Sequence, residues 1–341
     1  MILDKLPLEV LHLILGFVGP SQLQQQEACT LTVSRWWYNA AKPIVLEELS
    51  LTSNQLILLP QYMYEDVTRF TRRVTLHIHS VEDQPNSENP HSDTEEQKEA
   101  KWERALVNHL EKFSVLLFRC ARLENFTFQA HSHFDPRDPL APRQEYLSTW
   151  SPAGLIDNLP TSKLTELVID TCGSEIADNI HICPRAVRQI PRLRSVRIRM
   201  RRICPEILDI DQTTEDPTKS SNIESLIFNL SLIEPDRLSA GFSHHCTEGR
   251  RGWELFDDMV AAGSEAAKRL PSIKVLRILC HKHPSQEIVV RDCITGTKTI
   301  LPGEGEWDWG DDGESDPDDQ DFSDQGFSDF SDLSNESDHL N

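Results

Sequence analysis

The sequence predicts an α/β protein in three parts: a short helical N-terminal region, a long region of alternating strands and helices, and an acidic tail. Three observations predict this organisation. The chain begins with an almost wholly apolar helix, a strand-like apolar pattern recurs between residues 46 and 278, and the last forty or so residues carry acids without any Lys or Arg. We place the boundaries of the three parts at 1–45, 46–302 and 303–341.

The first helix is expected in the run from Leu6 to Val18. Pro7 suits its first turn, where a missing N–H is harmless and φ is already fixed. Only Glu9, His12 and Gly16 interrupt the apolar run, and they share one narrow stripe. A helix that is apolar over the rest of its circumference is expected to be buried nearly all round.

Two further short helices are expected before residue 45. Ser21 and Gln24 have the spacing of a capping box at the start of the second. The third runs from Ser34, and Pro43 is expected to end it. Three helices in about 40 residues are near the lower limit for an independent core. The apolar side chains that these helices cannot bury among themselves must therefore contact the rest of the chain or another protein.

This N-terminal region resembles an F-box, over about 40 of the 341 residues. The matching residues are Leu6, Pro7, Glu9, Val10, Leu11, Ile14 and Leu15, followed by Val33, Ser34, Arg35, Trp36, Trp37, Ala40 and Ala41. The segment between Val18 and Val33 is two or three residues longer than usual and rich in Gln, and Trp37 takes the place of the family Trp. The resemblance implies docking on a Skp-family adaptor through Leu6, Pro7, Leu11, Ile14, Leu15, Val33 and Trp37.

The second region repeats a pattern of apolar, two variable, apolar, one variable and apolar residues. It occurs at Leu46/Leu49/Leu51, Leu123/Phe126/Phe128, Leu164/Leu167/Ile169, Leu193/Val196/Ile198, Ile223/Leu226/Phe228 and Ile273/Leu276/Ile278, with Val74/Leu76/Ile78 as a looser member. Alternating apolar positions indicate strands with one buried face. Helical runs precede several of them, at residues 102–119, 184–188 and 253–269. Repeated helix and strand predict an α/β solenoid with parallel strands.

The repeat resembles an irregular leucine-rich repeat, and F-box proteins commonly carry such repeats after the F-box. A generic α/β fold with buried strands is the alternative. Residues 287–293 and 297–301 are expected to form a hairpin at the end of the sheet. We expect polar surface loops at 83–98, 131–142, 209–221 and 234–251. The acidic tail from residue 303 has no apolar periodicity and is expected to be disordered.

The charge and cysteine content exclude several functions. The net charge is −21, of which the fifteen acids after Gly303 account for most, and this argues against nucleic-acid binding. No segment is long enough to span a membrane, and the N-terminus does not resemble a secretion signal. The eight cysteines include no CxxC pair, so we expect neither disulfides nor a metal site, and a cytoplasmic or nuclear location. We expect no cofactor.

Three His-x-His pairs, at 77/79, 131/133 and 281/283, lack further metal ligands nearby and are expected on exposed strand faces or in loops. Arg197, Arg199 and Arg201 alternate along one strand and share one face, which suits carboxylates or phosphates of a substrate. The equally weighted alternative is a solvated Arg face paired with nearby acids, or a nuclear-import patch.

No phosphate-binding loop or catalytic motif is present, so we expect a protein that is not an enzyme. By resemblance, the chain is the substrate-recognition subunit of an SCF (Skp–cullin–F-box) ubiquitin ligase, contacting the adaptor, through it the cullin complex, and an unknown protein substrate. The alternatives are an interaction scaffold with the same two modules and no degradation, and an enzyme with an unrecognised site.

Overall fold

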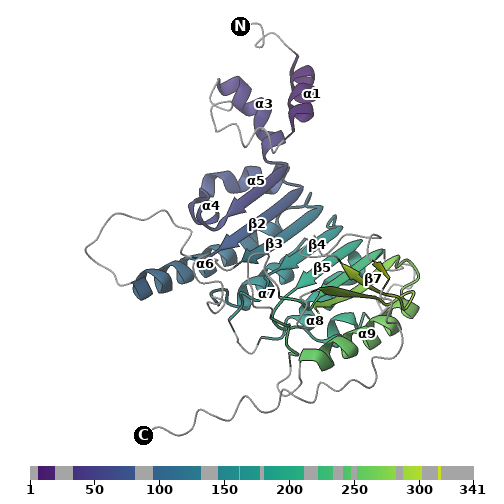
Figure 1. Cartoon of the computed structure of the whole chain (residues 1–341). Coiled ribbons are helices and arrows are strands. Elements are labelled where there is room, and N and C mark those ends of the chain that lie inside the picture. The colour runs from purple at the N-terminus through teal and green to yellow at the C-terminus, as the bar shows by residue number, and fades with distance from the viewer. Residues whose placement is uncertain are drawn as a thin grey trace, which may run out of the picture.

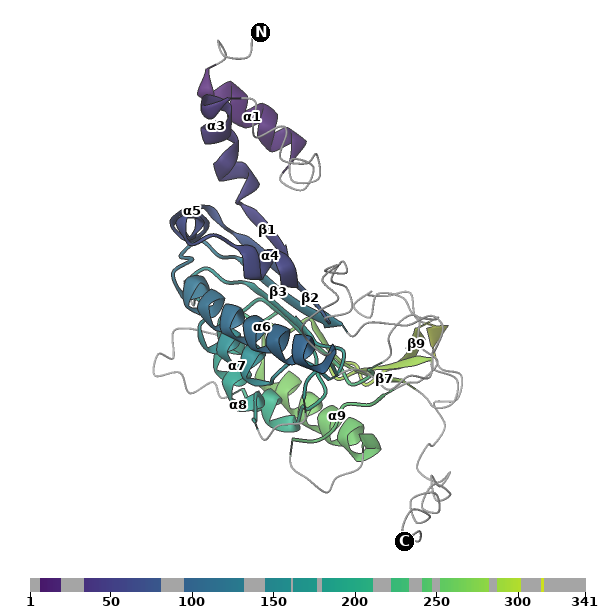
Figure 2. The same cartoon turned by 90° about the vertical axis from the view of Figure 1, so that its left-hand side faces the viewer.

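The structure is a computed structural model that describes residues 7–19, 34–80, 95–131, 145–160, 162–176, 180–210, 222–232, 241–246, 252–281, 287–301 and 314–315. Two N-terminal helices stand beyond one edge of a large sheet, and the remaining helices cover one face of that sheet (Figures 1 and 2). The chain is therefore a mixed α/β protein, as the sequence predicts.

The N-terminal helices are α1 (Leu8–Val18) and α3 (Arg35–Val45). Pro7 precedes α1, and its carbonyl oxygen accepts a hydrogen bond from the Leu11 N–H at 3.1 Å. The hydroxyl of Ser34 caps α3 by accepting from the Trp37 N–H at 3.1 Å. The expected second helix lies outside the described residues.

The expectation that Pro43 ends the third helix is wrong, because α3 continues through Pro43 to Val45. The last turn closes despite the proline, since the Leu46 N–H still donates to the Lys42 carbonyl at 3.0 Å. Lys42 also joins this helix to α5 (Tyr64–Phe70), through an ion pair with Asp66 at 2.9 Å. The polypeptide then enters the first strand within three residues of α3.

The sheet runs in chain order from β1 to β10. Its parallel strands are β1 (Glu48–Thr52), β2 (Arg73–His79), β3 (Asn125–His131), β4 (Glu166–Asp170), β5 (Ser195–Arg199), β6 (Ser225–Asn229) and β7 (Val275–His281). The predicted strands are confirmed in position and register, since the apolar residues of the repeat align side by side. The aligned row is Val74, Phe126, Leu167, Val196, Leu226 and Leu276, all buried.

The predicted hairpin is also confirmed, as β8 (Ile288–Asp292) and β9 (Lys298–Leu301), which extend the sheet with antiparallel pairing. Of the expected tail, only Glu314–Ser315 is described. These two residues form β10, whose backbone pairs with Ile300 and Thr299 of β9. The rest of the tail lies outside the described residues.

The helical layer consists of α4 (Ser53–Leu58), α5 (Tyr64–Phe70), α6 (Glu95–Phe118), α7 (Trp150–Asp157), α8 (Cys183–Gln189) and α9 (Gly252–Arg269), with short 3-10 turns η2 (Gln61–Met63), η4 (Ile190–Arg192) and η5 (Pro205–Leu208). The predicted helices correspond to α6, α8 and α9. Because α6 begins at Glu95, the end of the expected loop 83–98 is helical. No described helix has the length and hydrophobicity needed to cross a bilayer.

The buried apolar residues form separate clusters. One continuous core extends along the sheet from Leu46 to Cys293 between strands and helices. A much smaller cluster holds α1 against α3, with Leu11, Leu15, Ala40 and Ala41 at its centre. A third lies on the other face of the sheet, where the hairpin joins it, and contains Ile227, Leu279, Ile288 and Val290.

Candidate functional site

The inner side of α1 packs on α3. Leu11 and Leu15 are 0% and 1% exposed and contact the small residues Ala40 and Ala41, which let the two helices approach closely. Val18, Trp37, Ile44 and Val45 complete this cluster from its margin. These contacts hold the N-terminal helices together, so the inner side chains of α1 serve the fold of this region.

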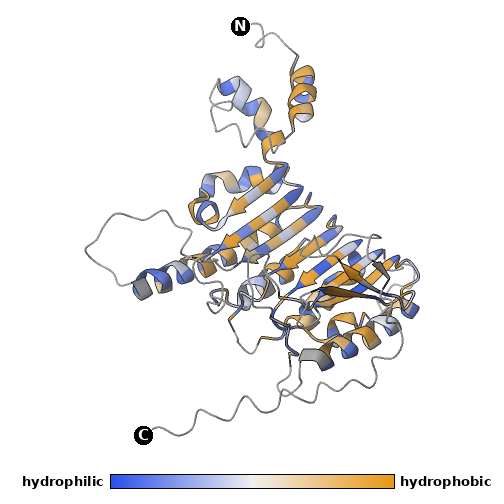
Figure 3. Cartoon of the chain, viewed as in Figure 1, coloured by the Kyte–Doolittle hydropathy of each residue, from blue (hydrophilic) through white to orange (hydrophobic). Residues whose placement is uncertain are grey.

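The outer side of α1 is apolar and exposed. Val10, Leu13, Ile14 and Phe17 are exposed by 40, 75, 44 and 94%. Their spacing of i, i+3, i+4 and i+7 places all four on one face of the helix, which we call the outer stripe. In Figure 3, α1 is coloured mostly as hydrophobic. A contiguous apolar row of this kind is typical of a protein-interaction surface.

This geometry divides the seven predicted adaptor-binding residues. Ile14 lies in the outer stripe, and Pro7, which directly precedes α1, is exposed. Leu11 and Leu15 face inward, and Trp37 is half-buried at the edge of the same cluster. Leu6 and Val33 lie outside the described residues. Val10, Leu13 and Phe17 were missed, although their helical spacing is visible in the sequence.

Within the described part of the chain, α1 is thus covered on one side, whereas the sequence predicts a helix buried nearly all round. The contacts described for α1 come from α3, which covers only the side that carries Leu11 and Leu15. The apolar residues on the opposite side are exposed. Cover of these residues by another protein, one of the two possibilities raised by the sequence, stays a prediction.

The predicted Arg face is largely engaged by acids of the same chain. Arg199 binds Asp170 of the neighbouring strand with two hydrogen bonds, Nε to Oδ1 at 2.7 Å and Nη2 to Oδ2 at 2.6 Å. The two side chains are 12% and 4% exposed. Asp170 also accepts from the Cys172 N–H at 3.1 Å, in a turn where Cys172 has a φ of 45°. This bidentate ion pair is largely buried and joins β4 to β5, so it is part of the fold.

Arg201 is held by two acids from the connections that follow β3 and β4. Its backbone N–H donates to the buried Glu175 carboxylate, and its guanidinium donates to the Glu175 carbonyl at 3.1 Å and pairs with Glu145. Burial raises the pKa of the Glu175 carboxyl, against the opposing hydrogen bonds from Thr171 and Arg201. Arg197 lies on β5 between Val168 and Ile227. An acidic ligand on this face would compete with Asp170, Glu145 and Glu175.

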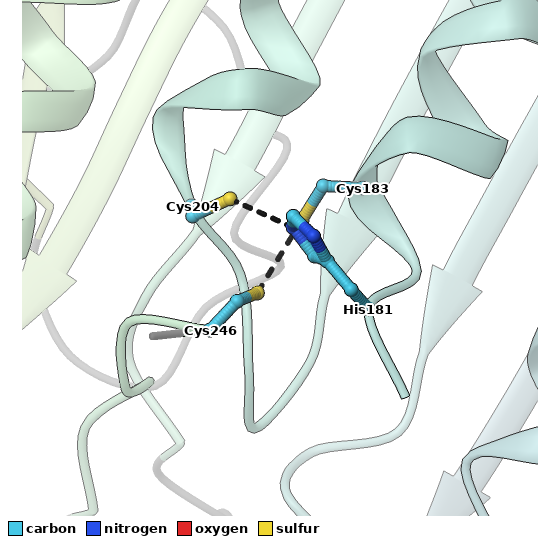
Figure 4. Close-up of side chains that lie close together, drawn as sticks. All are labelled: His181, Cys183, Cys204 and Cys246. Carbon is cyan, nitrogen blue, oxygen red and sulfur yellow. Dashed lines mark hydrogen bonds between the residues drawn. The ribbon is translucent and has the colours of Figure 1, made fainter. Parts of the chain in front are cut away.

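Four side chains of types that can bind a metal ion lie together beyond the C-terminal ends of β4, β5 and β6. His181 and Cys183 lie at the start of α8, Cys204 immediately precedes η5, and Cys246 lies in the connection between β6 and α9. Their donor atoms all lie within 4.8 Å of one another, and Figure 4 shows the four side chains pointing toward one point. The His181 Nε2 to Cys204 Sγ distance is 3.1 Å, and the Cys183 Sγ to Cys246 Sγ distance is 3.7 Å.

No protein-family model and no curated protein sequence has a significant match to this chain. Its function is therefore inferred from its own residues and their geometry.

The expectation that the cysteines form no metal-binding group missed this cluster. Closely spaced cysteine pairs are the usual sequence signal of such a group, whereas Cys183, Cys204 and Cys246 are 21 and 42 residues apart. The available signal was their position in the repeat, because each falls between a strand and the following helix. The expected surface loop 234–251 likewise contains an ordered ligand-bearing segment, residues 241–246.

The described members of the three His-x-His pairs lie outside this group. His77 and His79 are half-buried on β2, and the rings of His79 and His131 lie 6.5 Å apart. His281 is buried, where its Nδ1 lies 3.1 Å from the Ser231 hydroxyl and its ring stacks on Phe242 at 3.8 Å. His133 and His283 lie outside the described residues.

Proposed function

We propose that this chain is the substrate-recognition subunit of an SCF-type E3 ubiquitin ligase. The F-box-like helices α1 and α3 bind a Skp-family adaptor, which connects them to the cullin complex. The sheet and its helices form an irregular leucine-rich-repeat solenoid that holds a protein substrate in the cytoplasm or nucleus. The observation that carries this proposal is the exposed outer stripe on a helix whose sequence resembles that of an F-box.

The outer stripe supplies the energy for adaptor binding. Fully covering a Leu or Phe side chain is worth roughly 1.5–3 kcal/mol. Leu13 and Phe17, the two most exposed members, have nearly all of this contribution still to gain. Four adjacent apolar side chains can exceed the cost of association when they enter a complementary groove, as an amphipathic helix does in helix-in-groove recognition.

The mechanism is positional. Binding a substrate to one part of the chain and the adaptor to another raises the effective concentration of a substrate lysine near the charged ubiquitin-conjugating enzyme. The chain itself then needs no catalytic residue. On the repeat region, the face that carries Arg197, Arg199 and Arg201 is the candidate for an acidic substrate segment.

A matched pair of variants tests adaptor binding. Leu13 on α1 and Leu58 on α4 are almost equally exposed, at 75% and 76%. Leu13→Asp should abolish co-purification of the adaptor and cullin with the full chain, whereas Leu58→Asp should leave it unchanged. Both should keep the parent Tm, because neither side chain is buried.

Equal recovery of the adaptor with Leu13→Asp and with the parent would contradict the proposal. A second measurement separates a ligase subunit from a scaffold. Proteins captured by the full chain should show ubiquitination that depends on Leu13. Capture of the adaptor and cullin with no such ubiquitination would favour the scaffold.

A further inference from the structure

We propose that His181, Cys183, Cys204 and Cys246 bind one structural zinc ion. This inference is independent of the proposed ligase function. A set of three cysteines and one histidine is one of the common ligand sets of structural zinc sites. Thiolate and imidazole ligands favour zinc over the hard cations Mg²⁺ and Ca²⁺, which prefer oxygen.

The donor distances fit a tetrahedral ion. Zn–S bonds of about 2.3 Å place two sulfurs of a tetrahedron about 3.8 Å apart. Cys183 Sγ and Cys246 Sγ are 3.7 Å apart. The remaining donors lie within 4.8 Å of each other, with the His181 Nε2 3.1 Å from Cys204 Sγ. Small rotations of the side chains would bring all four donors to one centre.

The parallel sheet explains how distant residues meet. Cys183 begins the helix after β4, Cys204 follows β5, and Cys246 follows β6. The strands β4, β5 and β6 are parallel neighbours in register. The connections that follow their C-terminal ends therefore begin side by side. Each of three successive connections therefore delivers one cysteine to the same place, and the first also delivers His181.

The surroundings of the ligands match a metal site. The Nδ1 of His181, the nitrogen that faces away from the sulfurs, lies 3.8 Å from a carboxylate oxygen of Glu206. Zinc-binding histidines typically direct their second ring nitrogen toward a carboxylate or carbonyl, which fixes the ring orientation. Glu206 is thus a positioning residue for His181.

The ion would fasten the connection after β6 to the neighbouring repeat. Residues 241–246 already lie along the preceding connection: the Ser243 hydroxyl donates to the Met200 carbonyl at 2.7 Å, and the Ile203 N–H donates to the His244 carbonyl at 3.0 Å. Cys246 ends this segment beside Cys183 and Cys204. With four protein ligands, zinc has no open position for a water or substrate, so its role is structural.

Metal analysis of the full chain tests the proposal. The protein, purified without chelator and dialysed, should retain one zinc per chain. Cys246→Ser should lose the zinc, and it suits the test because Cys246 is only half-buried. Cys120→Ser is the matched control, since Cys120 is buried outside the group and its sulfur faces the Leu116 carbonyl, which a serine hydroxyl can also use.

Two measurements keep the test informative if a variant folds poorly. The parent chain, stripped and reloaded with Co²⁺ alone, should show the visible absorption of tetrahedral cobalt and a near-ultraviolet thiolate-to-cobalt band. Glu206→Gln should keep this spectrum but bind zinc about 10–100-fold more weakly, the usual cost of removing an outer partner. Glu206 is 64% exposed, so its replacement should not affect folding itself.

Three results would overturn the proposal. The first is a parent chain that retains no zinc, and the second is zinc retained equally by Cys246→Ser. The third is a disulfide between Cys183 and Cys246 in the zinc-free native protein, detected as a loss of two hydrogens by mass spectrometry. A disulfide requires the two sulfurs to approach to about 2.05 Å and leaves His181 and Cys204 without a role.

Discussion

The N-terminal helices and the sheet region use apolar side chains in opposite ways. In the sheet region, Phe113, Phe126, Phe128 and Phe228 are at most 2% exposed, within one continuous core. On α1, Phe17 is 94% exposed, and only four residues of the two N-terminal helices form a buried cluster. Apolar residues of the sheet therefore stabilise the fold, whereas those of the outer stripe are proposed to stabilise a complex with an adaptor.

The largest expected effect compares two phenylalanines. Phe128→Ala should lower the free energy of unfolding by about 3–5 kcal/mol, because it leaves a cavity in the core of the sheet. Phe17→Ala should change it by less than about 0.5 kcal/mol, because this side chain is already in water. Denaturant unfolding of both variants measures the difference. A comparable loss in the two would mean that α1 packs on the rest of the chain.

The Arg face gives a second comparison, between a buried and an exposed ion pair. Arg199→Ser should lower the free energy of unfolding by about 3 kcal/mol, because Asp170 is left buried without its charge partner. Arg194→Ser should leave stability nearly unchanged, since its pair with Glu224 is exposed.

Thermal unfolding of the two Arg variants decides this point. An unchanged Tm for Arg199→Ser would indicate that the Arg face is available to a ligand rather than part of the fold. If the pair is structural as expected, Arg197→Ser is the variant of choice for measuring acidic-peptide binding, because it leaves Asp170 and Arg199 in place.

The tail should matter little for folding. Deleting residues 303–341 removes the two-residue pairing of β10 with β9, at Ile300 and Thr299. A pairing this short at the edge of a sheet should contribute no more than about 1 kcal/mol. The truncated chain should therefore unfold close to the parent in a thermal melt. A loss of many degrees would show that the tail packs against the sheet more extensively.

The smallest expected effect is a pH dependence from His77 on β2. Burial, and secondarily the nearby His79, lower the pKa of His77 below its usual 6.5. The unfolded chain then binds a proton more readily than the folded chain, so stability is full above pH 6.5 and declines as pH falls toward the lowered pKa. His77→Gln should flatten the fall in Tm below pH 6.5. An unchanged slope would assign the dependence to other groups.

The sequence predicts features that depend on local periodicity. Alternating residues such as Leu167 and Ile169 identify a strand with one buried face, and the structure confirms these strands in register. The repeat also places Asp170 beside Arg199, because both occupy the same face of neighbouring strands. Their burial as a bidentate pair could not be predicted, since it depends on the connections that close over them.

Features that depend on packing between distant segments were missed. Whether Leu11 or Leu13 faces inward is decided by where α3 lies, and hydrophobicity alone treats the two alike. The cysteine group forms only when three connections are brought together by the sheet. Pro43 stays within α3 because a proline near the end of a helix removes one hydrogen bond while the final turn still closes.

The affinity of the purified full chain for a Skp-family adaptor tests the central claim most directly. The measurement compares the parent with two double variants, Leu13→Ala with Phe17→Ala on the outer stripe, and Leu58→Ala with Phe118→Ala elsewhere, all at exposed positions. The first should bind at least about tenfold more weakly with an unchanged Tm, since each 1.4 kcal/mol is tenfold, and the second should bind as the parent does. Equal affinity of all three proteins would contradict the role of the outer stripe.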